Sequence, residues 1–148
     1  MCTIILANQV FEDYTPVIAA NRDEIYGRGS IPPRRTQIDD ERWMIAPRDE
    51  LAGGTWMGFN SDGILVGIAN IWIQDGQSND GDAYTSGEKM RSRGLLCDDV
   101  LRQTGLESAR REIKESVSEN EYNGFNLVVG SPKGAFGATS DGELRFVD

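Results

Sequence analysis

The chain has 148 residues, 39% of them hydrophobic, and a formal net charge of −9 from 24 acidic and 15 basic side chains. This length predicts a single domain that can bury a core, and the acidic balance disfavours binding to nucleic acid or to an anionic membrane surface. The sequence contains no histidine. Its absence excludes Ser-His-Asp and Cys-His catalysis, and zinc or haem sites that depend on histidine ligands.

The basic residues are mostly arginines, since the only lysines are Lys89, Lys114 and Lys133. An acidic surface poor in lysine is typical of a halophilic protein, although an ordinary acidic protein is the alternative. The sequence has no apolar stretch of transmembrane length and no basic region before its first apolar run, so we expect neither a membrane span nor a signal peptide. Cys2 and Cys97 are too few and too far apart to indicate a disulfide framework, and we expect a cytoplasmic protein.

The first half of the chain reads as strands separated by turns. Apolar and β-branched residues predict strands at 2–7 and 17–21, which "FEDY" can join as a hairpin. Glycines and prolines in "GRGSIPPRRTQIDDER", at 27–42, predict a loop. "WMIAP" predicts a short strand, and the segment at 50–73 predicts two strands around an "NSDG" turn.

The second half predicts a polar loop, two helices and three further strands. We expect the helices at about 91–104 and 106–118, with Ser92 as an N-cap and Gly105 separating them, packed on one face of a sheet. "FNLVVG", "GAFGAT" and "ELRFVD" predict the strands. This order predicts an α+β fold in one domain over residues 1–148, and the last strand, so close to Asp148, suggests a shortened version of a longer domain.

Cys2 is the first candidate for chemistry. If Met1 is removed, the α-amino group of Cys2, with a reference pKa of about 7.7–8.0, can take the proton of its own thiol. The alternative is that Cys2 is a small apolar residue that begins a buried strand.

The tetrapeptide "NRDE" follows the second predicted strand. In a hairpin register, Asp23 lies near Cys2, where a carboxylate can orient the terminal ammonium group. Asn21 shares the face of Asp23 in an extended chain, whereas Arg22 points the other way unless the turn redirects it. The alternative is a polar turn in which Arg22 and Asp23 form a structural ion pair.

Other polar and aromatic residues are candidates for the rest of a site. Asn70 ends an apolar run and is the candidate donor to an oxyanion, whereas Asn60 reads as a turn residue. Trp56 and Trp72 either line a pocket or pack in the core. Gly53 and Gly54 allow close approach of the backbone, without the "GK[ST]" of a phosphate loop.

We expect no bound metal and no cofactor. "DGQSNDGDA" resembles a calcium loop only loosely, because Asp80 stands where an EF-hand needs glycine and Ser86 where it needs glutamate. Cys97 lies beside the apolar stripe of a predicted helix and is expected in the core.

Four segments in order, "MCTI", "AANRDE", "LAGGTWMGFN" and "SRGLLCDDVL", together with "NGFNLVVG", resemble the NRDE family, also called the transport and Golgi organisation protein 2 family. That family is similar to N-terminal-nucleophile hydrolases of the cysteine type, which include penicillin V acylase and bile salt hydrolase. The resemblance implies a four-layer αββα sandwich with largely antiparallel sheets. A sandwich that is incomplete at the C-terminus is the alternative to a complete one.

The resemblance also implies roles for individual residues. Cys2 matches the nucleophile, Asp23 the carboxylate that contacts it and Asn70 the oxyanion asparagine. The acylases carry an arginine where this chain has Ala20, and Arg22 is the candidate to replace it. The implied reaction is hydrolysis of an amide or acyl bond of a small molecule through an acyl-enzyme. The alternative is a non-catalytic binding or trafficking protein for an apolar cofactor such as haem or a lipid, and for either a homodimer is a candidate assembly.

Overall fold

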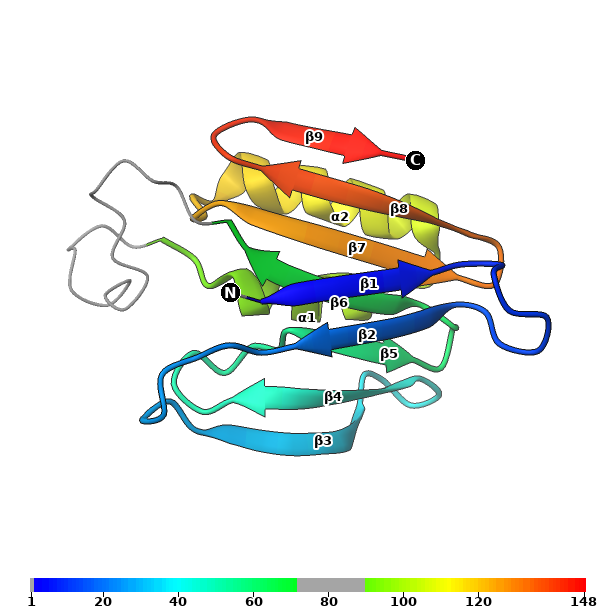
Figure 1. Cartoon of the computed structure of the whole chain (residues 1–148), viewed down its shortest axis with the longest axis horizontal. Helices are drawn as coiled ribbons and strands as arrows, with labels where there is room; N and C mark the ends of the chain where they lie inside the picture. The colour runs from blue at the N-terminus through cyan, green and yellow to red at the C-terminus, as the bar shows by residue number, and fades with distance from the viewer. Residues whose placement is uncertain (1, 72–89) are drawn as a thin grey trace.

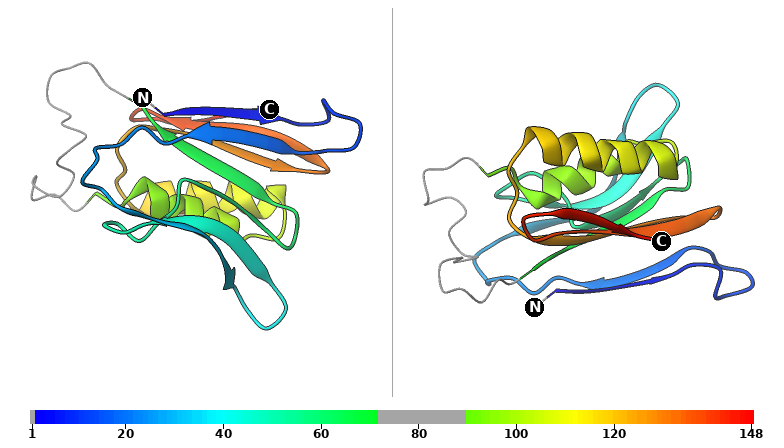
Figure 2. Two further views of the ribbon diagram at one scale, coloured as in Figure 1. Left: turned by 60° about the horizontal axis from the view of Figure 1, so that its bottom comes forward. Right: turned by 90° about the horizontal axis from the view of Figure 1, so that it is seen from above.

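The computed structural model describes residues 2–71 and 90–148, which form three layers (Figures 1 and 2). In chain order the elements of these residues are β1 (Thr3–Ala7), β2 (Val17–Asn21), β3 (Ser30–Gln37), β4 (Trp43–Asp49), β5 (Met57–Asn60), β6 (Leu65–Asn70), α1 (Arg93–Leu101), α2 (Leu106–Glu119), β7 (Phe125–Ser131), β8 (Gly134–Ser140) and β9 (Leu144–Val147). The predicted α+β class is confirmed.

The middle layer is an antiparallel sheet with the strand order β3-β4-β5-β6-β7-β8-β9. Neighbours in the sheet follow one another along the chain, and the helices are inserted between β6 and β7. The strands predicted around the "NSDG" turn and at the end of the chain are therefore confirmed. The polar loop predicted before the helices lies entirely within residues 72–89, outside the described part of the chain.

The prediction of a loop over residues 27–42 is wrong, because β3 occupies Ser30–Gln37. Proline cannot donate a ladder hydrogen bond and is tolerated in sheets at edges and bulges. β3 meets both conditions: it lies at the edge of the sheet, and its register with β4 shifts between Ile31 and Arg34, where Pro32 and Pro33 stand. The prolines therefore mark a bulged edge strand and not a loop.

Both helices cover the same face of the sheet, as predicted (Figure 2). Ser92 caps α1 by accepting the Gly94 N–H at 3.3 Å, and Gly105 precedes α2 as its N-cap residue. The core between the layers is apolar, and its largest fully buried side chains include Phe125, Met44, Ile64, Leu96, Leu101, Ile113 and Leu127. No helix among the described residues is long and apolar enough to cross a membrane.

The hairpin of β1 and β2 lies on the other face of the sheet (Figures 1 and 2). These strands are antiparallel neighbours, as predicted, and Thr3 is opposite Asn21. Gly67 of β6 makes close packing possible: a Cβ there would lie 2.7 Å from Cδ1 of Ile18 and 3.4 Å from Cδ1 of Ile4. Among the described residues, helices thus flank the large sheet only, and the hairpin leaves Ile5 62% exposed on its outer side.

Candidate functional site

The thiol of Cys2 lies against the main chain of Asp23. Cys2 directly precedes β1, and the register of the hairpin brings it beside the residues that follow β2. The N–H of Asp23 donates to Sγ of Cys2 at 3.4 Å, and Sγ is 3.8 Å from the carbonyl oxygen of Asp23. The expected proximity of these two residues is confirmed, and the contact runs through the backbone of Asp23. Cys2 itself is half-buried, between a core position and a surface one.

Asn21 closes the same end of the hairpin. Its Oδ1 accepts the N–H of Thr3 at 2.7 Å. Because Thr3 follows Cys2 directly, this bond fixes the backbone from which the thiol projects. A side-chain amide at the end of β2 therefore positions the start of β1.

Arg22 turns away from Cys2 toward β4, where it contributes to a group that we call the Asp49 clamp: Arg22, Arg28 and Asp49. Nη2 of Arg22 is 2.7 Å from Oδ2 of Asp49, and Nε of Arg28 donates to the same oxygen at 2.8 Å. The Arg22 guanidinium also lies over the ring of Trp56, with its carbon 4.9 Å from the ring centre. The clamp joins the turn after β2 to the end of β4.

The environment of Asp49 favours its charged form. Burial of the carboxyl group opposes ionisation, but hydrogen bonds from Arg28 and from the N–H of Ala52, with the charges of Arg28 and Arg22, outweigh burial and lower the pKa of Asp49. The sequence analysis did not identify Asp49 or Arg28. The available signal was an aspartate directly after a buried strand, but nothing in the sequence specifies partners 27 and 21 positions away.

Asn70 ends β6 at the same end of the molecule as the start of β1 (Figures 1 and 2). It pairs with Phe125, whose ring is fully buried in the core on the helix side of the sheet. By strand alternation, Asn70 shares that side with Ile68, whereas Gly67 faces the hairpin. The structure thus brings Cys2 and Asp23 together, whereas strand alternation places Asn70 on the side of the large sheet that faces away from the hairpin.

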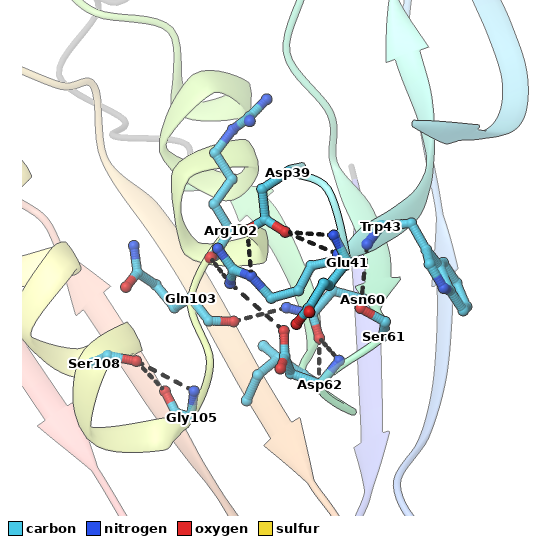
Figure 3. A network of polar contacts seen from close by, with 12 residues as sticks. Asp39, Glu41, Trp43, Asn60, Ser61, Asp62, Arg102, Gln103, Gly105 and Ser108 are labelled. Atoms are coloured by element: carbon cyan, nitrogen blue, oxygen red, sulfur yellow. Dashed lines mark hydrogen bonds and ion pairs between the residues drawn. The ribbon is translucent and has the colours of Figure 1, made fainter. Parts of the chain in front are cut away.

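Asn60 has a structural role, which extends beyond the predicted turn (Figure 3). Its Oδ1 accepts the N–H groups of Asp62 and Ile64, at 3.0 and 2.9 Å. Its amide donates to the carbonyl oxygens of Leu101 and Gln103, at 2.8 and 2.7 Å. This buried side chain therefore joins the β5–β6 turn to the end of α1.

The other residues proposed from the sequence either pack in the core or lie outside the part of the chain that the structure describes. Cys97 is fully buried as expected, and burial raises the pKa of its thiol, which makes it a poor nucleophile. Trp56 packs against the core and carries Arg22 on its ring. A Cβ at Gly54 would lie 2.2 Å from the carbonyl carbon of Gly94, so the predicted close approach is confirmed as packing against α1. Trp72 and the calcium-like segment lie outside the described residues.

Comparison of the sequence with known proteins identifies a family and several relatives. The family model described as "Transport and Golgi organisation 2" matches residues 1–145. The mouse "Transport and Golgi organization 2 homolog" and the human "Transport and Golgi organization protein 2 homolog" are each 32% identical to the chain, over 117 and 120 residues, which is 78% of this chain and 38% of each relative. An uncharacterized protein of Saccharomyces cerevisiae is 31% identical over 103 residues, 65% of this chain and 29% of the relative. The chain thus matches less than two fifths of the length of these relatives.

Proposed function

The chain belongs to the Transport and Golgi organisation 2 family, and from this membership and the surroundings of Cys2 we propose that it is an N-terminal-cysteine hydrolase of a small amide or acyl compound. The observation that carries the proposal is the contact of the Asp23 N–H with Sγ of Cys2 at 3.4 Å. This contact, with the carbonyl oxygen of Asp23 3.8 Å from the same sulfur atom, holds the thiol in one place at the end of the hairpin.

The proposed reaction uses the first residue of the processed chain as both nucleophile and base. After removal of Met1, the α-amino group of Cys2 accepts the thiol proton, and sulfur attacks the carbonyl carbon of the substrate. The ammonium group returns a proton to the leaving amine as the C–N bond breaks. Water then hydrolyses the thioester, releasing the acid and regenerating the thiol.

The Asp49 clamp supports this site as a positioning device. Asp23 follows Arg22 directly, and Arg22 is held both by Asp49 at 2.7 Å and by the ring of Trp56. A backbone fixed on one side of Asp23 keeps its N–H aimed at the sulfur atom, which is the kind of support that a reactive group needs. In this proposal Asp23 supplies the carboxylate that orients the terminal ammonium group. The oxyanion role of Asn70 requires in addition that its side chain, on the helix side of the sheet by strand alternation, turn toward Cys2 at the end of β6.

The proposed hydrolase function also implies a fold, a class of substrate, a cellular location and an assembly. The two stacked sheets with helices outside one of them agree with three layers of an αββα sandwich. We further propose a small-molecule substrate, a cytoplasmic location and a homodimer as the assembly to test.

The alternative proposal is a non-catalytic binding or trafficking protein for an apolar cofactor such as haem or a lipid. One feature favours it: the loop between β1 and β2 exposes Val10, Phe11 and Tyr14 by 66%, 52% and 70%. Exposed apolar side chains gathered on one loop are typical of surfaces that contact other apolar groups.

Labelling with a thiol-reactive acyl probe separates the two proposals. On protein that begins at Cys2, the hydrolase proposal expects stoichiometric acylation of Cys2, located by peptide mass spectrometry. Cys2→Ser should slow acylation strongly, and Cys97→Ser is the matched control that should leave it unchanged. Acylation of Cys97 in place of Cys2, or no turnover of acylated protein, contradicts the hydrolase proposal.

A further inference from the structure

A cavity of about 290 Å³ lies beside the NRDE segment, between the turn that follows β2 and the turn that follows β4. Its lining residues are Glu24, Ile25, Gly27, Arg28, Gly29, Glu50 and Leu51. The cavity therefore has ionised groups of both signs, two glycines without side chains and two apolar residues. The net charge of these groups determines which kind of ligand the cavity can bind.

The guanidinium groups around the cavity are already neutralised. Arg28 forms a bidentate pair with Asp49, at 2.8 and 3.2 Å, and its Nη1 is 3.3 Å from Oε2 of Glu24. Arg22, which is not a lining residue, pairs with Asp49 at 2.7 Å and lies 3.7 Å from Glu24. Two guanidinium groups thus face the carboxylates of Asp49 and Glu24, and an anion entering the cavity meets no excess positive charge.

Glu50 provides the excess negative charge. Among the residues that the structure describes, its carboxylate has no hydrogen bond or ion pair, whereas its N–H donates to the carbonyl oxygen of Gly29 at 3.2 Å. The carboxylate rests directly on Gly29, where a Cβ would lie 1.8 Å from Oε2 of Glu50. The glycine therefore leaves the space that places this carboxylate in the wall of the cavity.

The rim of the cavity is apolar. Ile25 is 65% exposed and Leu51 59% exposed, and Gly27 adds no side chain that would close the opening. A ligand that matches these groups carries a positive charge for Glu50 and an alkyl portion for the two side chains of the rim. A simple anion satisfies neither requirement.

We propose that this cavity binds a small organic cation, an ammonium or guanidinium group on a short alkyl chain, with Glu50 as its counter-ion. The cation donates to the Glu50 carboxylate, and its alkyl chain lies against Ile25 and Leu51. Binding here does not require Cys2 to be a nucleophile. The site is thus independent of the proposed hydrolase function, and Cys2→Ala should bind the same cations.

Titration with n-butylammonium, monitored by amide chemical shifts, tests the site in the intact chain. We expect saturable shifts at Gly27 and Gly29, with weaker or no shifts from n-butanol and from butyrate, which contain the same number of carbon atoms. Glu50→Gln should weaken binding by about tenfold, the effect of losing one charge-assisted hydrogen bond. Gly29→Ala should do the same, because its methyl group displaces the carboxylate.

Glu41→Gln is the matched control, since it removes the same charge from the exposed β3–β4 turn and should leave binding within about twofold. An equal loss in Glu41→Gln and Glu50→Gln would mean attraction by the net charge alone and would overturn the proposal. Butyrate binding as tightly as n-butylammonium would also overturn it. The comparison of the three probes on the unmodified chain remains decisive if a variant fails to fold.

Discussion

Arg22 and Asp49 contact each other at 2.7 Å across 27 positions of sequence, and the contact joins the end of the hairpin to the end of β4 in the large sheet. Asp49 is 7% exposed, and it also accepts from Arg28 and from the N–H of Ala52. An ion pair so placed stabilises the fold only while Asp49 is charged, which makes its contribution dependent on pH.

Asp49→Asn should lower the free energy of unfolding by about 2 kcal/mol at pH 7, because the hydrogen bonds to a charged acceptor are weakened. The pKa of Asp49 is lowered in the folded chain, so its stabilisation is complete above the ordinary aspartate pKa of about 3.9 and is lost as the pH falls through the lowered value. Denaturant unfolding from pH 7 to pH 2 should therefore show the two proteins converging in acid.

Asp40→Asn is the control for this measurement, since Asp40 is exposed in the turn between β3 and β4. It should change stability by less than about 0.5 kcal/mol at pH 7. A difference between the Asp49 variant and the unmodified chain that stays constant down to pH 2 would show that the clamp does not act through charge.

Asn60→Ala should destabilise the chain by about 2–3 kcal/mol, because two N–H groups and two carbonyl oxygens lose their partner in a buried setting. Thermal and denaturant unfolding measure the loss. Asn126→Ala removes the same side chain from an exposed position of β7 and should have little effect. Equal effects in both variants would mean that the four hydrogen bonds of Asn60 contribute nothing beyond those of a surface residue.

Retention of Met1 should abolish turnover. In that form the nitrogen of Cys2 is an amide and has no useful basicity, so the thiol lacks its base. Mass spectrometry of the N-terminus, paired with amide hydrolysis by each form, makes the comparison. If both forms turn over substrate equally, the terminal amine is not the base.

The melting temperature should rise between low and molar potassium chloride, because salt screens repulsion within a chain of net charge −9. Replacing three exposed acids, Glu12→Gln, Asp13→Asn and Glu41→Gln, should reduce the slope. A flat or falling melting temperature would remove the halophilic interpretation, which remains a prediction.

Most strands and both helices were predictable, because local signals mark them. The apolar and β-branched residues of "CTIILA" and "VIAAN", the "NSDG" turn, Ser92 and Gly105 each act within a few residues of the element they define. β3 was missed because Pro32 and Pro33 oppose a strand locally. Its position at the edge of the sheet, which makes them tolerable, is a property of the whole fold.

Only the part of the candidate site that is fixed by the pairing of β1 with β2 was predictable from the sequence. Pairing of β1 with β2 places Asp23 beside Cys2, and this follows from the sequence once the hairpin is accepted. The partner of Arg22 was not predictable, because Asp49 reaches it only after two sheets have stacked. The side of the sheet on which Asn70 lies follows from the alternation of side chains along β6. That alternation can be assigned only when the strand boundaries and the pairing with β7 are known from a structure.

The bulge at Pro32 and Pro33 has a consequence for self-association. An open edge strand offers a row of backbone donors to any neighbouring chain. Pro32 and Pro33 have no N–H to offer, and the bulge between Ile31 and Arg34 twists the edge. Intermolecular growth of the sheet through β3 is thereby obstructed, as gatekeeper residues obstruct fibril formation elsewhere. The other edge of that sheet, β9, contains no proline and is the edge of the two that is more open to such pairing.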